Sequence, residues 1–230
     1  FVDALRSLAK SDASLQVSTN QETGEALLAG MGELHLEITV YRLEEEQNIK
    51  VKVSPPIVVY RESVEGNNRG RSFEGKSPNR HNRFMMECEP LSPEVVAALR
   101  DGHFGNGNVR SGDAKEVGNK FGELGMDKDK MRKIFAIYGT NVLVNDTKGI
   151  QGLHETRELI IESFNEVCKK GPVADEPVMG MMVRLVDAKL HEDAIHRGPA
   201  QTIPAVRNGI KGAMIRARTV LMEPMQRSHV

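Results

Sequence analysis

Two consecutive prolines, Pro55 and Pro56, interrupt the 230-residue chain after its first quarter. Proline has a fixed φ and no backbone N–H, so neither a helix nor a central strand can run through such a pair. We therefore expect separate units on either side, with domains at 1–54 and 55–219 and a further element beginning at 220–230. With 39% hydrophobic residues, a chain of this length can bury a core of its own.

The segment before the prolines predicts the order helix, strand, strand, helix, strand. Leu5 and Leu8 recur at helical spacing, and the turn residues 20–24 separate two short apolar runs that are typical of a β-hairpin. A helix is expected over 33–47, where acidic residues come first and an apolar stripe follows. Alternation in 50–53 predicts an edge strand. This order is that of a ferredoxin-like split βαβ unit whose first strand is missing.

Both strand-like and helical patterns occur after the prolines, so the predicted fold class is α+β. Strand content is found at 57–60, 134–144 and 178–190, and helical periodicity with start or stop signals at 155–170 and 202–217. The segment 101–129 has four glycines in its first twelve residues and weak periodicity. We interpret it as an irregular insertion outside the core.

Charge is balanced over the whole chain but not locally. The 31 Lys and Arg residues nearly equal the 32 Asp and Glu residues, so no overall field attracts the chain to nucleic acid. Residues 69–83, however, hold five basic residues and one acid, and residues 194–222 hold five basic residues and no acid. Either stretch alone is typical of a solvated face, but together they are candidate phosphate-facing surfaces.

The cysteines and the apolar runs indicate the compartment. Cys88 and Cys168 have no paired spacing, which favours neither a zinc cluster nor a disulfide and suits a reducing environment. No apolar run approaches the roughly 18 to 20 residues that cross a bilayer, and no signal sequence opens the chain. The predicted location is the cytoplasm, without a membrane partner. Because the chain opens inside a predicted helix at Phe1, without an initiator methionine, we expect a fragment.

The segment Gly70–Ser77 satisfies the G-x-x-x-x-G-K-S pattern of a phosphate-binding loop. Such a loop needs a buried strand running straight into it and a helix opening at its Lys-Ser, so that helix amides meet the phosphates. Here the preceding strand ends near Val64, and Pro78–Arg83 shows no helical periodicity. We therefore interpret the segment as an exposed basic loop and predict no nucleotide site there.

Two histidine motifs resemble metal sites without meeting their geometry. His191 and His196 lie five residues apart at a predicted strand exit, whereas the zinc-protease box needs histidines four apart on a helix. His35-Leu36-Glu37 has the H-x-E of a deaminase, but no P-C-x-x-C follows it. No metal ligand is therefore predicted.

The loop 196–201 is the strongest candidate site. It joins a predicted strand to a predicted helix, and it offers the imidazole of His196, the guanidinium of Arg197 and the amide of Gln201 inside an acid-free stretch. Loops that carry such groups on a rigid scaffold are typical of binding sites. An ordinary capped turn with a surface histidine is the alternative.

Four motifs resemble those of the translocase family that contains elongation factor G and elongation factor 2. Leu190–Gly198 is similar to the family's stretch around a histidine that becomes diphthamide, and Ser77–Arg83 is similar to the second tip loop of domain IV. Gly30–Glu37 resembles the signature of domain III, and Leu221–Pro224 resembles the start of domain V. The Pro199-Ala200 pair after Arg-Gly is the form associated with archaeal members.

The resemblance implies a ferredoxin-like domain III and a domain IV with the ribosomal protein S5 domain 2-like fold, including a left-handed βαβ crossover. It also implies a GTPase whose catalytic G domain precedes Phe1. GTP and Mg would then belong to the full-length protein, and this chain would hold no catalytic site and no cofactor. The implied activity is GTP-dependent translocation of tRNA and mRNA during translation elongation. The implied partners of a monomeric factor are the ribosome, the tRNA–mRNA duplex in the decoding site and the diphthamide biosynthesis enzymes.

By this match His196 is the modified residue. The implied contacts of the tip with RNA and the ribosome come from both loops: Ser77, Pro78, Asn79, Arg80, His81, Asn82, Arg83, Arg197, Gly198 and Gln201. Two other classes stay open, a ribosome-biogenesis or splicing GTPase related to elongation factor 2 and a small nucleotide-using enzyme with the S5 fold. Titration with GTP or ATP separates the enzyme from the translocase.

Overall fold

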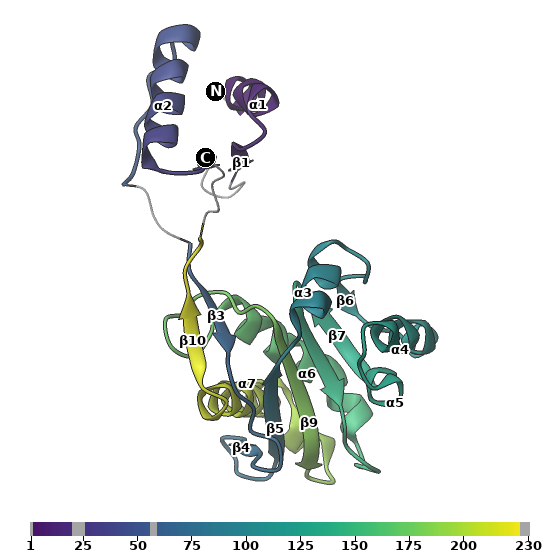
Figure 1. Cartoon of the computed structure of the whole chain (residues 1–230). Coiled ribbons are helices and arrows are strands. Elements are labelled where there is room, and N and C mark those ends of the chain that lie inside the picture. Colours follow the sequence, from purple (N-terminus) through teal and green to yellow (C-terminus); the bar gives the residue numbers. More distant parts are fainter. Residues whose placement is uncertain (1, 20–25, 56–58, 226–230) are drawn as a thin grey trace. The chain divides into compact units, whose positions relative to one another are not determined.

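The computed structural model describes residues 2–19, 26–55 and 59–225. The chain divides into two compact units, Phe1–Val59 together with Pro224–Val230, and Tyr60–Glu223 (Figure 1). Among the residues described, no helix is both long enough and apolar enough to cross a membrane.

The first unit has the α-β-β-α order that its sequence predicts. Its elements are α1 (Val2–Ser11), β1 (Gln16–Thr19), β2 (Ala26–Ala29) and α2 (Glu33–Gln47). β1 and β2 pair antiparallel, which confirms the hairpin, although its turn at 20–24 lies outside the described residues. A small core of Leu5, Leu8, Leu15 and Leu43 holds these elements together. α2 ends where Asn48 takes a left-handed φ of 52° and donates its N–H to the Leu43 carbonyl.

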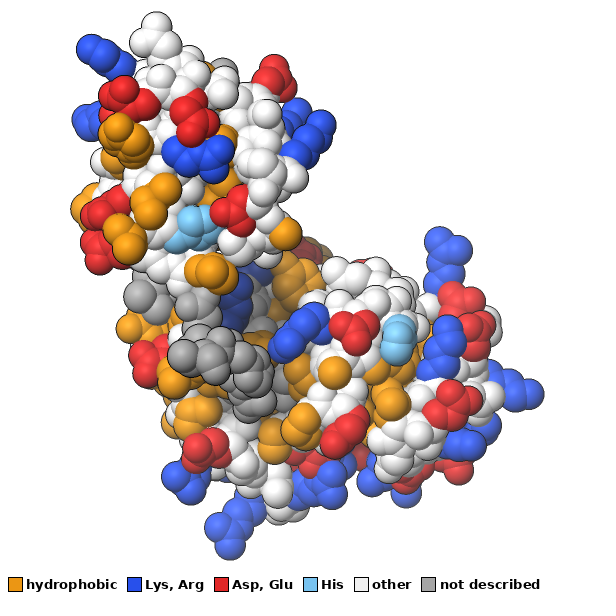
Figure 2. Space-filling model, turned by 45° about the horizontal axis from the view of Figure 1, so that its top comes forward, with side chains coloured by type: hydrophobic (Ala, Val, Ile, Leu, Met, Phe, Trp, Pro, Cys, Tyr) orange, Lys and Arg blue, Asp and Glu red, His pale blue; other side chains and the backbone are white. Residues whose placement is uncertain are grey.

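The strand predicted at 50–53 is absent, so that prediction is wrong. The segment is irregular, and the side chain of Val53 is 65% exposed. Alternation alone does not make a strand, because the backbone groups need a neighbouring strand to pair with. The described part of the first unit holds only the β1–β2 pair. Figure 2 shows further hydrophobic side chains at the surface of this unit, and the exposed ones on and beside α2 are Met31, Leu34, Ile38 and Tyr41.

The second unit is built on one mixed sheet of six strands. Its elements in chain order are β3 (Arg61–Val64), β4 (Phe73–Lys76), β5 (Arg83–Pro90), α3 (Pro93–Arg100), β6 (Gly107–Asn108), α4 (Ala114–Glu123), α5 (Lys128–Met131), β7 (Ile134–Tyr138), β8 (Asn141–Asn145), α6 (Leu153–Lys169), β9 (Met181–Lys189), the 3-10 helix η1 (Ala194–Arg197), α7 (Pro199–Arg216) and β10 (Thr219–Met222). The strand order is β4-β5-β9-β8-β7-β6. All neighbours pair antiparallel except β8 and β9, which are parallel and connected through α6.

Helices cover both faces of this sheet. α6 and α7 pack on one face, where Phe84, Phe164, Leu185 and Ile210 are among the fully buried side chains. α3, α4 and α5 pack on part of the other face. This α+β arrangement places the start of β5, the end of β9 and the start of α7 at one end of the domain.

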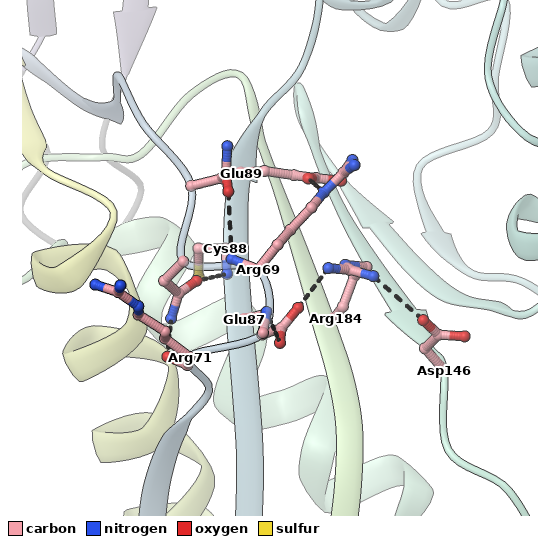
Figure 3. A network of polar contacts seen from close by, with 10 residues as sticks. Arg69, Arg71, Glu87, Cys88, Glu89, Asp146 and Arg184 are labelled. Carbon is pink, nitrogen blue, oxygen red and sulfur yellow. Dashed lines mark hydrogen bonds and ion pairs between the residues drawn. The ribbon is translucent and has the colours of Figure 1, made fainter.

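Side chains alternate along β5 between an apolar and a charged face. Phe84, Met86 and Cys88 belong to the core under α6 and α7. Glu87 and Glu89 point the other way, and they pair with Arg184 and Arg69 respectively (Figure 3). Arg184 also reaches Asp146 at 3.2 Å, so its buried charge has two carboxylate partners. A buried ion network of this kind needs every partner present.

The segment 101–129 is not an irregular insertion, and that prediction is wrong. It contains α4 and leads into α5, and the Phe104 and Phe121 rings stack with centroids 4.1 Å apart in a second core. The four glycines at 101–112 that suggested irregularity precede α4, and two further glycines inside α4 allow close packing. A Cβ on Gly122 would lie 2.2 Å from the Lys128 side chain, and one on Gly118 would lie 2.6 Å from that of Arg132. Glycine therefore lets α5 approach α4 here, at a cost in helical propensity.

Three other boundaries differ from their predicted positions. Residues 220–230 were expected to begin a third element, but β10 (Thr219–Met222) pairs antiparallel with β3 and so belongs to the second unit. Residues 57 and 58 of the strand expected at 57–60 are not described, residues 59 and 60 are irregular, and β3 begins at Arg61. The last helix begins at Pro199 and not at 202, because proline suits the first helical position, where no N–H donor is needed.

Candidate functional site

Two loops meet at the end of the sheet where β5 begins and β9 ends (Figure 1). One is the 77–82 turn between β4 and β5, and the other is the 190–198 segment between β9 and α7. The register pairs Arg83 with Lys189, so the residues just outside the two strands are neighbours. The structure therefore brings together the two segments that the sequence singled out. We call this end of the domain the tip.

Hydrogen bonds from two asparagines join the loops. The Asn82 Nδ2 donates to the His196 carbonyl oxygen at 2.7 Å, and the Asn79 Nδ2 donates to the same oxygen at 3.1 Å. The Asn82 Oδ1 accepts the His191 N–H at 3.0 Å, and the Gln201 Oε1 accepts the Asn79 N–H at 2.9 Å. The loops are thus tied through main-chain groups, which leaves the histidine rings free of this role.

The 77–82 turn is closed by its own hydrogen bonds. The Ser77 N–H donates to the Asn82 carbonyl at 3.0 Å, and the Arg80 N–H donates to the Ser77 carbonyl at 2.8 Å. Arg80 adopts a left-handed φ of 61°, which is uncommon for a residue with a side chain. This turn buries Ser77 and Asn82 and leaves the side chains of Arg80 and His81 exposed.

Three histidine rings gather at the tip. The ring centroids of His191 and His196 lie 4.4 Å apart, and the His81 centroid lies 5.1 Å from His191 and 5.4 Å from His196. Beside them is a shallow hollow of about 410 Å³, lined by Arg80, His81, Arg83, Lys189, Leu190, His191 and Glu192. Within 2–19, 26–55 and 59–225, no three His, Cys, Asp or Glu side chains are grouped so that they could hold a metal ion.

A row of three cations crosses the sheet next to this hollow. Lys76 pairs with Arg83 across β4 and β5, and Arg83 pairs with Lys189 across β5 and β9, and all three side chains are exposed. Glu74 neutralises part of this charge, lying 3.0 Å from Lys76 and 3.1 Å from Arg83. Lys76 and then Arg83 hold the pKa of Glu74 below its ordinary value, so it stays ionised. Like charges at paired positions repel each other, and an anion laid across the row would relieve that repulsion.

Five of the residues predicted to contact RNA are instead built into the scaffold. Arg197 is only 8% exposed, and its Nη2 lies 2.5 Å from the Glu155 carboxylate. The Gly198 carbonyl accepts N–H groups from the first turn of α7, and the Gln201 side chain holds Asn79. Ser77 and Asn82 are buried. Hydrogen bonds within the domain hold these five residues, and their contact with RNA stays a prediction.

The exposed members of the predicted set are Pro78, Arg80, His81 and Arg83, and His196 is partly exposed. The sequence pattern does not point to Lys189, Glu192 or Ile195, which also belong to the tip. Ile195 is 79% exposed and precedes His196 directly. An apolar residue beside a predicted binding histidine is a weak signal, since single exposed apolar side chains are common.

The phosphate-loop pattern at Gly70–Ser77 has a different structural basis. Phe73–Lys76 forms β4, and the chain then turns into β5, so no helix opens at Lys76. A Cβ on Gly75 would lie 2.0 Å from the Ala205 carbonyl oxygen in α7. Glycine is needed at this position for close packing of helix on strand, and not for approach to a phosphate.

Comparisons with known proteins agree with the two structural units. The family model described as elongation factor G, domain III matches residues 1–55, and the model described as elongation factor G, domain IV matches residues 107–218. Proteins named elongation factor 2 are similar over nearly the whole chain: that of Picrophilus torridus is 55% identical over 227 residues, or 99% of this chain and 31% of the relative. This chain belongs to the elongation factor G and elongation factor 2 family.

Other members of the family match almost as well. Elongation factor 2 of Thermococcus kodakarensis is 50% identical over 99% of this chain and 30% of its own length, and that of Methanosphaera stadtmanae is 46% identical over 100% and 31%. The chain thus spans about a third of the length of the relatives that it matches. The domain IV match begins at 107, yet β4 and β5 lie in the same sheet as β9, so the structural domain is larger than the matched segment.

Proposed function

We propose that this chain is the domain III and domain IV part of an elongation factor 2 that promotes GTP-dependent translocation of tRNA and mRNA on the ribosome. In this proposal the tip enters the decoding site and contacts the codon–anticodon duplex. The GTPase site, with its GTP and Mg, lies in the part of the full-length factor that this chain does not include. The ribosome and the tRNA–mRNA duplex are the proposed partners of a monomeric factor in the cytoplasm.

The row Lys76, Arg83 and Lys189 is the observation that carries this proposal. Every codon must pass, so the duplex has to be recognised by its backbone and its shape and not by its sequence. Three exposed cations at paired positions, with Arg80 beside them, suit a polyanionic backbone. Because the row lies on a sheet, its side chains are spaced by strand geometry and keep their order without a ligand.

We further propose that His196 is the site of the diphthamide modification. Diphthamide adds a fixed positive charge at the end of a lengthened imidazole, which gives reach and charge that neutral histidine lacks. Two side-chain amides hold the His196 main chain, while the ring is partly exposed among His81 and His191. A fixed main chain and an accessible ring suit His196, because the modifying enzymes must reach the ring and the modified ring must then contact RNA. The diphthamide biosynthesis enzymes are thus proposed partners.

The role of the tip is tested by reading-frame maintenance. The full-length factor with His196→Ala should translocate with several-fold more frameshifting than wild type in a dual-reporter assay, because the modified side chain no longer reaches the duplex. Exposed Lys115 on α4 offers a control, and Lys115→Ala should keep the wild-type frame. Faithful reading by the His196→Ala factor would refute the proposed role.

A further inference from the structure

Asn82 is buried where the strands of the tip meet the segment that carries His196. Its carboxamide donates to the His196 carbonyl oxygen at 2.7 Å and accepts the His191 N–H at 3.0 Å. Its main-chain N–H also donates to the Ser77 hydroxyl at 3.0 Å, and the residue has no exposed surface. One side chain therefore fixes the backbone at two points, five residues apart, on the segment that carries His196.

That segment has little rigidity of its own. It is the short 3-10 helix η1, capped by Asp193, whose carboxylate accepts the Ile195 N–H at 3.1 Å and whose carbonyl accepts the His196 N–H at 3.2 Å. A single turn of 3-10 helix has poor hydrogen-bond geometry. The position of His196 thus depends on bonds from outside the turn, and Asn82 supplies the shorter of the two amide bonds to its carbonyl.

An enzyme that adds a substituent to an imidazole must receive the ring in one orientation, and small misplacements cost large factors in rate. The His196 ring has His191 at 4.4 Å and His81 at 5.4 Å between centroids, so rotation of the turn would press it against one of them. We propose that Asn82 is a positioning residue for the modification of His196. It acts through its hydrogen bond to the main-chain carbonyl of His196. This inference rests on the proposed modification.

A second asparagine provides a matched control. Asn141 is 1% exposed, and its carboxamide donates to the Val178 carbonyl at 2.7 Å and accepts the Met181 N–H at 3.1 Å. It lies near the first residue of β9, whereas Asn82 lies near the last, roughly 26 Å away at about 3.3 Å per residue. Removal of the Asn82 carboxamide takes one of two donors from the His196 carbonyl, which keeps the Asn79 Nδ2, and takes the acceptor of the His191 N–H. Removal of the Asn141 carboxamide takes a donor from the Val178 and Tyr138 carbonyls and the acceptor of the Met181 N–H. The two losses of stability are therefore of the same kind.

The experiment compares four full-length factors made in an archaeal host that carries out the modification: wild type, Asn82→Ala, Asn82→Asp and Asn141→Ala. Mass spectrometry of the His196 peptide at fixed times after induction gives the modified fraction, and thermal unfolding gives each Tm. We expect modification at least tenfold slower in both Asn82 variants. Asn141→Ala should stay within twofold of wild type at a comparable fall in Tm. The carboxylate introduced by Asn82→Asp keeps an acceptor for the His191 N–H but cannot donate to the His196 carbonyl.

Each outcome bears on a separate statement. Equal slowing in Asn82→Ala and Asn141→Ala would show that stability limits the reaction, and a wild-type rate in Asn82→Ala would show that the amide is not needed. Either result overturns the inference. A wild-type rate in Asn82→Asp would overturn the part assigned to the His196 carbonyl. If His196 stays unmodified in the wild-type factor, the proposed modification itself is wrong, and the wild-type measurement alone shows this.

Discussion

Arg197 and Glu155 form an ion pair that ties the turn before α7 to the first turn of α6. The Arg197 side chain is 8% exposed. It packs against Gly152, where a Cβ would lie 1.8 Å from the Arg197 Nη1. The residue that follows the histidine of the tip is therefore an internal brace. Its charge contributes to holding the loop and not to the exposed surface of the tip.

Arg197→Ala should lower the free energy of unfolding of the second unit by about 2 kcal/mol, because both the ion pair and the packing of the long side chain are lost. Arg207 pairs with Glu166 at 3.1 Å, but both side chains are more than 40% exposed. Arg207→Ala should therefore change the free energy by less than about 1 kcal/mol. Urea unfolding of the two variants measures the difference. Equal effects would mean that Arg197 is not a brace.

Glu62 is a fully buried carboxylate that backbone amides satisfy. It accepts the N–H groups of Val173, Ala174 and Glu176 at 3.0, 2.9 and 3.3 Å, and it has no exposed surface. Glu62→Ala leaves these donors without an acceptor, and we expect a loss of about 3 kcal/mol. Glu65 pairs with Arg218 at the surface, so Glu65→Ala should cost less than about 1 kcal/mol. Chemical denaturation distinguishes the two, and a similar small loss for both would contradict this account of Glu62.

Acid should selectively weaken the first unit through Asp12. Its carboxylate accepts from the Ser14 hydroxyl and N–H and lies 2.8 Å from the His35 Nε2, and these bonds lower the pKa of Asp12 from 3.8 to about 2. Because the folded pKa is the lower one, the stabilisation is complete above the unfolded pKa and is lost as pH falls toward 2. In circular dichroism melts, Asp12→Asn should lose less stability than wild type between about pH 4 and pH 2.

The control for this experiment is Asp3, whose side chain is fully exposed. Asp3→Asn should follow the wild-type pH dependence. If Asp12→Asn and Asp3→Asn lose stability in parallel over this window, the hydrogen bonds to Asp12 do not contribute to the acid response.

The cation row predicts how ribosome binding responds to salt. In the full-length factor, Lys189→Ala should weaken ribosome binding at low salt and reduce the slope of log K against log salt concentration by about one, because one phosphate contact is lost. Lys115→Ala on α4 should leave the slope unchanged. Filter binding over a series of KCl concentrations provides the slopes. An unchanged slope for Lys189→Ala would remove this residue from the RNA-contacting surface.

Long periodic elements could be predicted from the sequence alone. α6 and α7 carry apolar stripes over many turns, and β9 is mostly apolar, so these elements could be predicted from residue spacing and composition. α4 was not predicted, because the glycines at 101–112 suggested that the whole segment 101–129 is irregular, although α4 begins only at Ala114. The strand predicted at 50–53 was wrong because alternation can be seen in a short segment, whereas the neighbouring strand that a β-strand needs cannot.

The candidate site likewise has features that could be predicted from local sequence and features that depend on distant contacts. The two loops were predicted from their residues and from family resemblance, and the structure brings them together. The burial of Arg197 was not predictable, because its partner Glu155 lies 42 residues earlier in the chain. The row Lys76, Arg83 and Lys189 could not be predicted from the sequence either, because these three residues become neighbours only through the register of the strands.

The pairing of β3 with β10 has a structural consequence. The polypeptide enters the second unit along Arg61–Val64 and leaves it along Thr219–Met222, and these strands run antiparallel as one ribbon. The last turn of α7 leads directly into this ribbon, while its first turn begins at the histidine loop. One helix, α7, thus connects the two-stranded ribbon through which the chain enters and leaves the second unit directly to the loop that carries His196.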